Sequence, residues 1–271
     1  MHTTSGNLFK KRYIFVDFLT NFGIIRLKLS RRFYRLFYLP CLILVGLFYY
    51  KKRIIMKKSH IIISDITCMK EKFCIAGFDT YEKRMKRLMI DGGYWNANQI
   101  PTRYCEILVD NEEFKEPRDY PHRTEDVNID IKSIEILQEF EPGKELANAL
   151  KSSISKDIQS IFHHHVKENA YVPQKTKCPS LGAILIPAHN IEFFTDDGKL
   201  RARITDYSKQ LYELKVSCKY LRDIFEKDKD VKNLNNAIAA SQYAHCRIGL
   251  ARKFLMQENH CYLMLNGLFL Y

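Results

Sequence analysis

The sequence lacks the short motifs that would assign an enzymatic reaction. Its 271 residues contain no phosphate-binding glycine loop, no nucleophile elbow, no H-E-x-x-H zinc motif and no cytidine-deaminase signature. The eight cysteines include neither a C-x-x-C pair nor a tight cluster, which argues against a zinc site and against a disulfide framework. We therefore expect reduced thiols in a cytoplasmic protein, with no cofactor and no bound metal ion.

Acidic residues are almost missing from the first 55 residues. That segment holds 11 Lys and Arg but a single acid, Asp17, whereas the rest of the chain holds 32 Lys and Arg against 30 Asp and Glu. The net charge of +12 therefore comes mostly from the N-terminal segment. The remainder is nearly neutral, so overall charge does not predict nucleic-acid binding there, and any basic surface must be local.

The apolar run at 36–50 is too short for a typical transmembrane helix. It has 15 residues, contains Pro40 and Gly46, and is flanked on both sides by basic residues, whereas a spanning helix needs about 20. We interpret residues 1–55 as a prefix of upstream DNA read in frame, with translation starting at Met56. The alternative is a short hydrophobic anchor, and contact with a membrane is expected only in that case.

Beyond Met56 the chain consists of short β-rich runs separated by turn residues. Asp197-Gly198 is typical of a hairpin turn, and short strands at this spacing indicate small barrels or sandwiches. We predict a mainly β (α+β) fold with two tandem OB-like β-barrels and an intervening amphipathic helix. The expected divisions are 56–126 for the first unit, 127–179 for a connector and packing helix, and 180–271 for the second unit.

Apolar residues recur at every fourth position between 142 and 166. This spacing places them on one face and predicts a single long helix that packs between the two β units. Residues His163 to His165 would stand at its end, where adjacent side chains diverge by about 100° and cannot all bind one ion. The stripe consists of Leu146, Leu150, Ile154, Ile158, Phe162 and Val166.

Five segments beyond the prefix resemble a known family. They read IIISDITCMKEKFCIAGFD, PHRTED, SLGAILIPA, CRIGLARKF and CYLMLNGLFLY, and together they resemble the dual OB-containing domain family of prokaryotes. The resemblance runs from about Met56 to Tyr271 and implies two OB folds, nucleic-acid binding and an association with conflict or defence systems. Two departures are Lys253, where the family favours proline, and Val127, where a tryptophan is expected.

OB surfaces bind single strands by stacking bases on aromatic rings and neutralising phosphates with Arg and Lys. In the segment 246–254, alternation predicts Arg247 and Gly249 on one face, with Arg252 at its rim. The alternative for Arg247 is an ion pair with a carboxylate, and for the aromatic residues a place in the core. The expected ligand-binding set is Arg247, Gly249, Arg252, Arg201, Arg203, Tyr212, Arg87, Trp95 and Asn266, with Lys86, Tyr94 and Tyr207 as further candidates.

Two other classes of function stay open at this point. His122, Glu125 and Asp126 lie within five residues, and with Asp65 they could transfer a proton or bind a divalent ion; the alternative is a hydrogen-bonded connector. A protein-interaction module is the other class. We interpret the chain as a module that binds nucleic acid, as single-stranded DNA or RNA, or a nucleotide-like ligand. It would be accessory to a defence or nucleic-acid-processing system, whose proteins are its expected partners.

Overall fold

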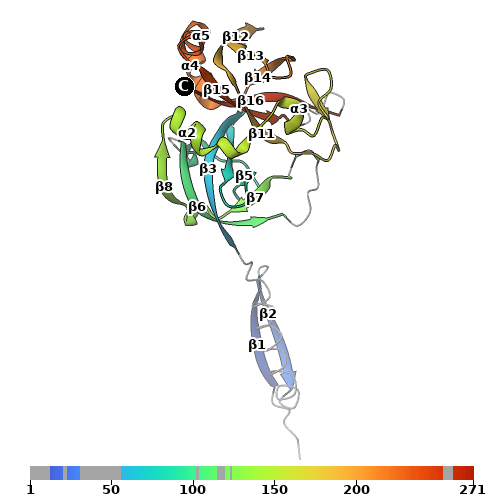
Figure 1. Ribbon diagram of the computed structural model, residues 1–271. Coiled ribbons are helices and arrows are strands. Elements are labelled where there is room, and N and C mark those ends of the chain that lie inside the picture. The colour runs from blue at the N-terminus through green and yellow to red at the C-terminus, as the bar shows by residue number, and fades with distance from the viewer. Residues whose placement is uncertain are drawn as a thin grey trace, which may run out of the picture. The chain divides into compact units, whose positions relative to one another are not determined.

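The chain divides into two compact units, residues 1–55 and residues 56–271. In the first, β1 (Tyr13–Thr20) and β2 (Gly23–Ser30) form an antiparallel hairpin. The apolar run at 36–50 lies outside the described residues. In the part of the chain that is described, no helix is long and apolar enough to cross a membrane. The computed structural model (Figure 1) describes residues 13–20, 23–30, 56–101, 104–114, 120–122, 124–252 and 259–271.

The second unit is mainly β and contains two sheets. In the first sheet the strand order is β3-β4-β5-β7-β6-β8, and β3 also pairs with β6, so five strands close into a ring. The pairing of β5 with β7 is parallel, and the other pairings around the ring are antiparallel. The strands are β3 (Lys57–Met69), β4 (Lys72–Asp79), β5 (Arg84–Met89), β6 (Tyr104–Glu113), β7 (Asp126–Ile129) and β8 (Glu135–Phe140), with short 3-10 turns η1 (Ala97–Gln99) and η2 (Ile131–Ser133).

The second sheet has the order β12-β13-β14-β16-β15-β11-β9. The short strand β10 lies outside this order and pairs with β16. Only the short η4 (Ala188–Asn190) separates β11 from β12, so one continuous segment pairs with β15 at its start and with β13 at its end. The strands are β9 (Ile154–Ser155), β10 (Tyr171–Pro173), β11 (Leu181–Pro187), β12 (Ile191–Asp196), β13 (Lys199–Thr205), β14 (Leu211–Val216), β15 (Tyr243–Leu250) and β16 (His260–Leu270).

Local sequence patterns account for most of these elements. The predicted hairpin is confirmed: Asp197 and Gly198 both have positive φ, as a two-residue turn between β12 and β13 requires. Two further helices follow β14, namely α4 (Lys219–Asp228) and α5 (Lys232–Ala239). Each buries an apolar stripe on the second core, through Leu221 and Phe225 in α4 and Leu234 and Ile238 in α5.

The predicted long helix at 142–166 is wrong. The segment folds as α2 (Lys144–Ala149), η3 (Lys151–Ser153), β9 and α3 (Ile158–Ile161). Leu146 and Leu150 pack in the core of the first sheet, whereas Ile158, Phe162 and Val166 pack in the core of the second. Residues at the four-residue spacing therefore pack first in the core of the first sheet and then in the core of the second. Asp157 starts α3 by accepting a hydrogen bond from the Ser160 backbone N–H at 2.7 Å.

The predicted connector at 127–179 also differs from the structure. It contains most of β7 and all of β8, which belong to the first sheet. The two sheets then meet along β3 and β16 (Figure 1). The interface between them positions the candidate site.

Candidate ligand-binding site

Arg247 lies in the interior and not on an open surface, which corrects the prediction for the segment 246–254. Its side chain is fully buried, and its Nε and Nη2 donate to the two carboxylate oxygens of Asp65 on β3, each at 3.2 Å. Nη1 donates to Ser153 Oγ at 3.0 Å. The alternation along β15 is as predicted, but both faces of the strand are covered, because the first sheet packs on the side that carries Arg247.

Gly249 is also covered. A Cβ placed on it would lie 2.0 Å from Nδ2 of Asn266, so the Asn266 side chain occupies the space above the glycine. Asn266 is buried as well, and its Oδ1 accepts a hydrogen bond from Ser217 Oγ at 2.8 Å. The flat surface expected beside Arg247 is therefore an internal contact between β15 and β16.

Near the pair of Arg247 and Asp65, further buried charged side chains also join the two sheets. Arg87 on β5 donates to Asp126 at 2.6 Å and to Ser180 Oγ at 2.8 Å. Asp126 also pairs with Arg252 at 3.4 Å. Glu125 accepts from the Ser180 backbone N–H at 2.5 Å and from its hydroxyl at 2.8 Å. Burial opposes the charge on Arg87, but Cys74 and these two acids raise its pKa.

These contacts fit the hydrogen-bonded connector that was the alternative to a proton-transfer or metal site. Of the four side chains considered for proton transfer, Asp65, Glu125 and Asp126 are each held by separate donors. His122 donates from Nε2 to the Leu250 carbonyl oxygen at 3.0 Å. Among the described residues, no group of three His, Cys, Asp or Glu side chains could hold a metal ion. Burial raises the pKa of the neighbouring Cys74 thiol, which keeps that group protonated and a poor nucleophile.

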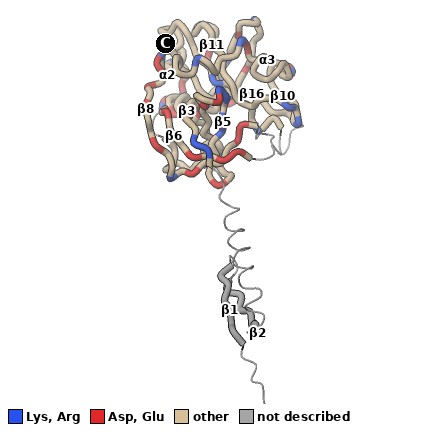
Figure 2. Tube along the Cα trace, turned by 60° about the horizontal axis from the view of Figure 1, so that its bottom comes forward, with Lys and Arg blue, Asp and Glu red and all other residues tan. Residues whose placement is uncertain are grey.

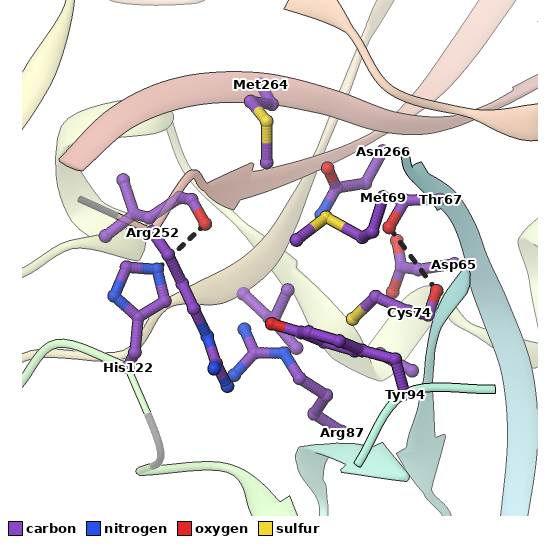
Figure 3. Close-up of a pocket in the computed structure, with 13 residues that line it drawn as sticks. Asp65, Thr67, Met69, Cys74, Arg87, Tyr94, His122, Arg252, Met264 and Asn266 are labelled. Carbon is purple, nitrogen blue, oxygen red and sulfur yellow. Dashed lines mark hydrogen bonds between the residues drawn. The ribbon is translucent and has the colours of Figure 1, made fainter. Parts of the chain in front are cut away.

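A small cavity of about 30 Å³, lined by both apolar and polar side chains, lies at this junction (Figure 3). That volume suits one or two water molecules and no larger ligand. Figure 3 shows Arg252 extending past His122 toward Arg87 and Tyr94. Six candidates from the sequence line this one cavity, namely Asp65, Arg87, Tyr94, His122, Arg252 and Asn266.

A larger groove of about 490 Å³ opens next to the cavity on the outer face of the second sheet. Met69, Arg252 and Met264 line both spaces. The sheet register builds the groove floor, because Arg201 on β13 pairs with Lys215 on β14, and Lys215 pairs with Met264 on β16.

The groove contains more cations than acids. Four basic side chains line it, whereas Glu213 is its only acid among the described residues. Glu213 is held by Arg203 at 2.7 Å, and Arg201 reaches Asp196 at 3.2 Å on the sheet edge. No ion pair joins Lys215 or Arg222 to another described residue. The four basic side chains are Arg201, Lys215, Arg222 and Arg252.

Two further observations mark this excess of positive charge. The pKa of Lys215 is lowered from its ordinary value, first by partial burial and then by the charges of Arg222, Arg201 and Lys199. The Nε of Arg201 is buried and has no hydrogen-bond partner in the described part of the protein. Unpaired donors around a concave space suit an anionic ligand.

The remaining candidates from the sequence lie elsewhere. Tyr212 and Trp95 are core residues with 0% and 1% exposure, and Trp95 donates from Nε1 to the Leu88 carbonyl oxygen at 2.7 Å. Lys86 is fully buried against Asp79 at 2.9 Å. Arg203 does share the outer face of β13 with Arg201, but it pairs with Glu213 and lies over the Phe194 ring at 4.2 Å. Tyr207 is exposed on the loop that follows β13.

Sequence reasoning missed Lys215 and Arg222. In the segment LYELKV, Tyr212, Leu214 and Val216 form the apolar phase, so alternation alone could have placed Tyr212 inside and Lys215 outside. Nothing in the sequence placed Arg222, because its approach to the groove depends on how α4 packs on the sheet.

Comparison with known proteins adds no family. No protein-family model and no curated protein matches the chain. The resemblance to the dual OB-containing domain family therefore stays a prediction.

Proposed function

We propose that the protein binds single-stranded nucleic acid or a nucleotide-like ligand in the outer groove of the second sheet. The observation that carries the proposal is the set of four basic side chains around a concave space with one acid, itself already paired. Phosphate groups would neutralise Lys215 and Arg222, which line the groove and lack ion-pair partners among the described residues.

The topology of the first sheet supports an OB-like assignment. If its five ring strands are numbered in chain order, the pairing runs 1-2-3-5-4-1 with a parallel contact between 3 and 5. A small five-stranded Greek-key barrel is the architecture of OB folds.

The second sheet follows the same path if β11, η4 and β12 count as one bent first strand. That segment pairs with β13 and β15, β13 pairs with β14, and β14 pairs in parallel with β16. Helices α4 and α5 stand between the third and fourth strands. On this reading the groove lies on strands 2 and 3, β13 and β14, the face with which OB folds bind oligonucleotides.

Fluorescence anisotropy with labelled octamers of single-stranded DNA and RNA tests the proposal. Lys215→Ala and Arg222→Ala should each weaken binding at low salt. Each should also make the salt dependence shallower by about 0.7 in the slope of log K against log salt, because one phosphate contact is lost. Lys229→Ala is the matched control, since Lys229 is an exposed lysine just after the end of α4 that pairs with Glu226.

Wild-type affinity and slope for both groove variants would overturn the proposal, as would the absence of binding to either octamer at low salt. A preference for DNA or RNA by the wild-type protein would then refine the ligand class.

A further inference from the structure

Three aromatic side chains cluster where β10 meets the start of β16. The rings of Tyr171 and His260 are stacked, with centroids 3.6 Å apart and planes 18° apart. Tyr262 meets both rings edge to face, at 5.9 Å from each centroid. His260 and Tyr262 line the outer groove, and Tyr262 is 41% exposed.

The strand register places this aromatic cluster next to the basic side chains of the groove. His260, Tyr262 and Met264 alternate with buried residues along β16, so they share its outer face. Met264 is the partner of Lys215. Tyr262 therefore lies one strand over and two residues along from Lys215, a Cα separation of about 8 Å from standard strand spacings.

We infer that Tyr262 is a base-stacking residue and that the groove accepts one nucleotide unit at a time. The base of the bound nucleotide lies on the aromatic cluster, and its phosphate lies against Lys215 and Arg222. The inference rests on the proposed function, since it names the parts of the ligand that the two ends of the groove would hold. The groove volume of about 490 Å³ is in the range of pockets that bind small ligands. It is larger than a free phosphate ion needs.

Other aromatic residues near the cations do not offer the same surface. Phe194 is covered by the Arg203 guanidinium at 4.2 Å, and Tyr94 has Arg252 over its ring at 5.1 Å. Tyr262 keeps exposed ring area, and the stacked pair of Tyr171 and His260 supports it from the side. A base with a π-face would gain from this platform whatever its sequence, because stacking needs no base-specific hydrogen bond.

The test uses the full chain and a short single-stranded oligonucleotide that contains one 2-aminopurine. The fluorescence of this base is quenched when it stacks. We expect quenching on binding to the wild-type protein. Tyr262→Ala should weaken binding roughly 5- to 150-fold, the range that corresponds to one stacked base, and should abolish the quenching. Tyr262→Phe keeps the ring and should restore both.

Three controls separate stacking from a general defect. Tyr81→Ala removes a tyrosine that is 74% exposed in the turn between β4 and β5, far from the groove residues in the sheet order, and it should change neither affinity nor quenching. The salt slope of Tyr262→Ala should equal that of the wild type, unlike the slope of Lys215→Ala. An oligonucleotide that is abasic at every position should bind wild type and Tyr262→Ala equally well, because it offers no base to stack.

The inference is overturned if Tyr262→Ala retains full quenching and affinity, or if it changes the salt slope as Lys215→Ala does. Either result leaves the proposed function intact as long as Lys215→Ala still loses affinity. If the wild-type protein binds no oligonucleotide at low salt, the proposed function fails and this inference fails with it.

Discussion

The interior between the two sheets and the groove outside the second sheet hold the same kinds of side chain in opposite circumstances. In the interior, Arg247 is held by Asp65 and Arg87 by Asp126, so each of these guanidinium groups has a carboxylate partner. Figure 2 shows Lys and Arg segments interleaved with Asp and Glu segments around β3, β5 and β6. In the groove, Lys215 and Arg222 face the same space with no acid of their own among the described residues.

The partners of a cation therefore decide whether it stabilises the fold or stays available for a ligand. A buried charge without a partner costs several kcal/mol, so the interior accepts guanidinium groups only together with acids. A groove open to water tolerates unpaired cations at little cost, and an anionic ligand can then serve as the missing partner. Arg252 is intermediate, because it contacts Asp126 while its side chain, 30% exposed, also lines the groove.

The largest effect should come from breaking the interior pair. Arg247→Met should lower the free energy of unfolding by about 3–5 kcal/mol, because Asp65 is left buried without its counter-charge. Urea denaturation measures the loss. The matched control is Arg203→Met, which removes an arginine that is 40% exposed and should cost far less, because surface ion pairs contribute little to stability. Equal losses in the two variants would show that the distinction between interior and surface cations is wrong.

A smaller effect should come from the glycine that the sequence placed on the ligand surface. Gly249→Ala should cost about 1–3 kcal/mol, because its Cβ would overlap the Asn266 amide. The double variant Gly249→Ala with Asn266→Ala removes the overlapping group. Its loss should be smaller than the sum of the two single losses in a double-mutant cycle. Additive losses would mean that the two residues are not in contact.

The smallest effect concerns the pH dependence of binding in the groove. The pKa of Lys215 is lowered from 10.5, and an anionic ligand favours the protonated form. The affinity for the oligonucleotide should therefore be highest at pH values below the lowered pKa of Lys215. It should decrease as the pH rises through that pKa, because the lysine loses its charge. Lys215→Arg should shift the decline to higher pH, because a guanidinium stays charged. Oligonucleotide titrations between pH 7 and 10 measure it, and identical profiles would remove Lys215 from the site.

Several elements could be predicted because their signals are local. The alternation of apolar residues located the strands, and Asp197-Gly198 located a hairpin turn whose backbone requires positive φ. The helix at 142–166 could not be predicted in this way. An apolar stripe shows that residues are buried, but it does not show that they are buried in the same core, and here Leu150 and Ile158 belong to different ones.

The short β-rich runs were enough to predict that residues 56–271 are mainly β, and alternation along the strand was enough to place Arg201 and Arg203 on one face of β13. Which cations are buried depends on how the two sheets pack. Arg247 and Arg201 both alternate with apolar neighbours on a strand, but the first sheet covers one of them and leaves the other beside the groove. Alternation distinguishes the two faces of a strand, whereas the packing of a second layer, which depends on residues far away in the chain, decides whether a face meets water, a carboxylate or a ligand.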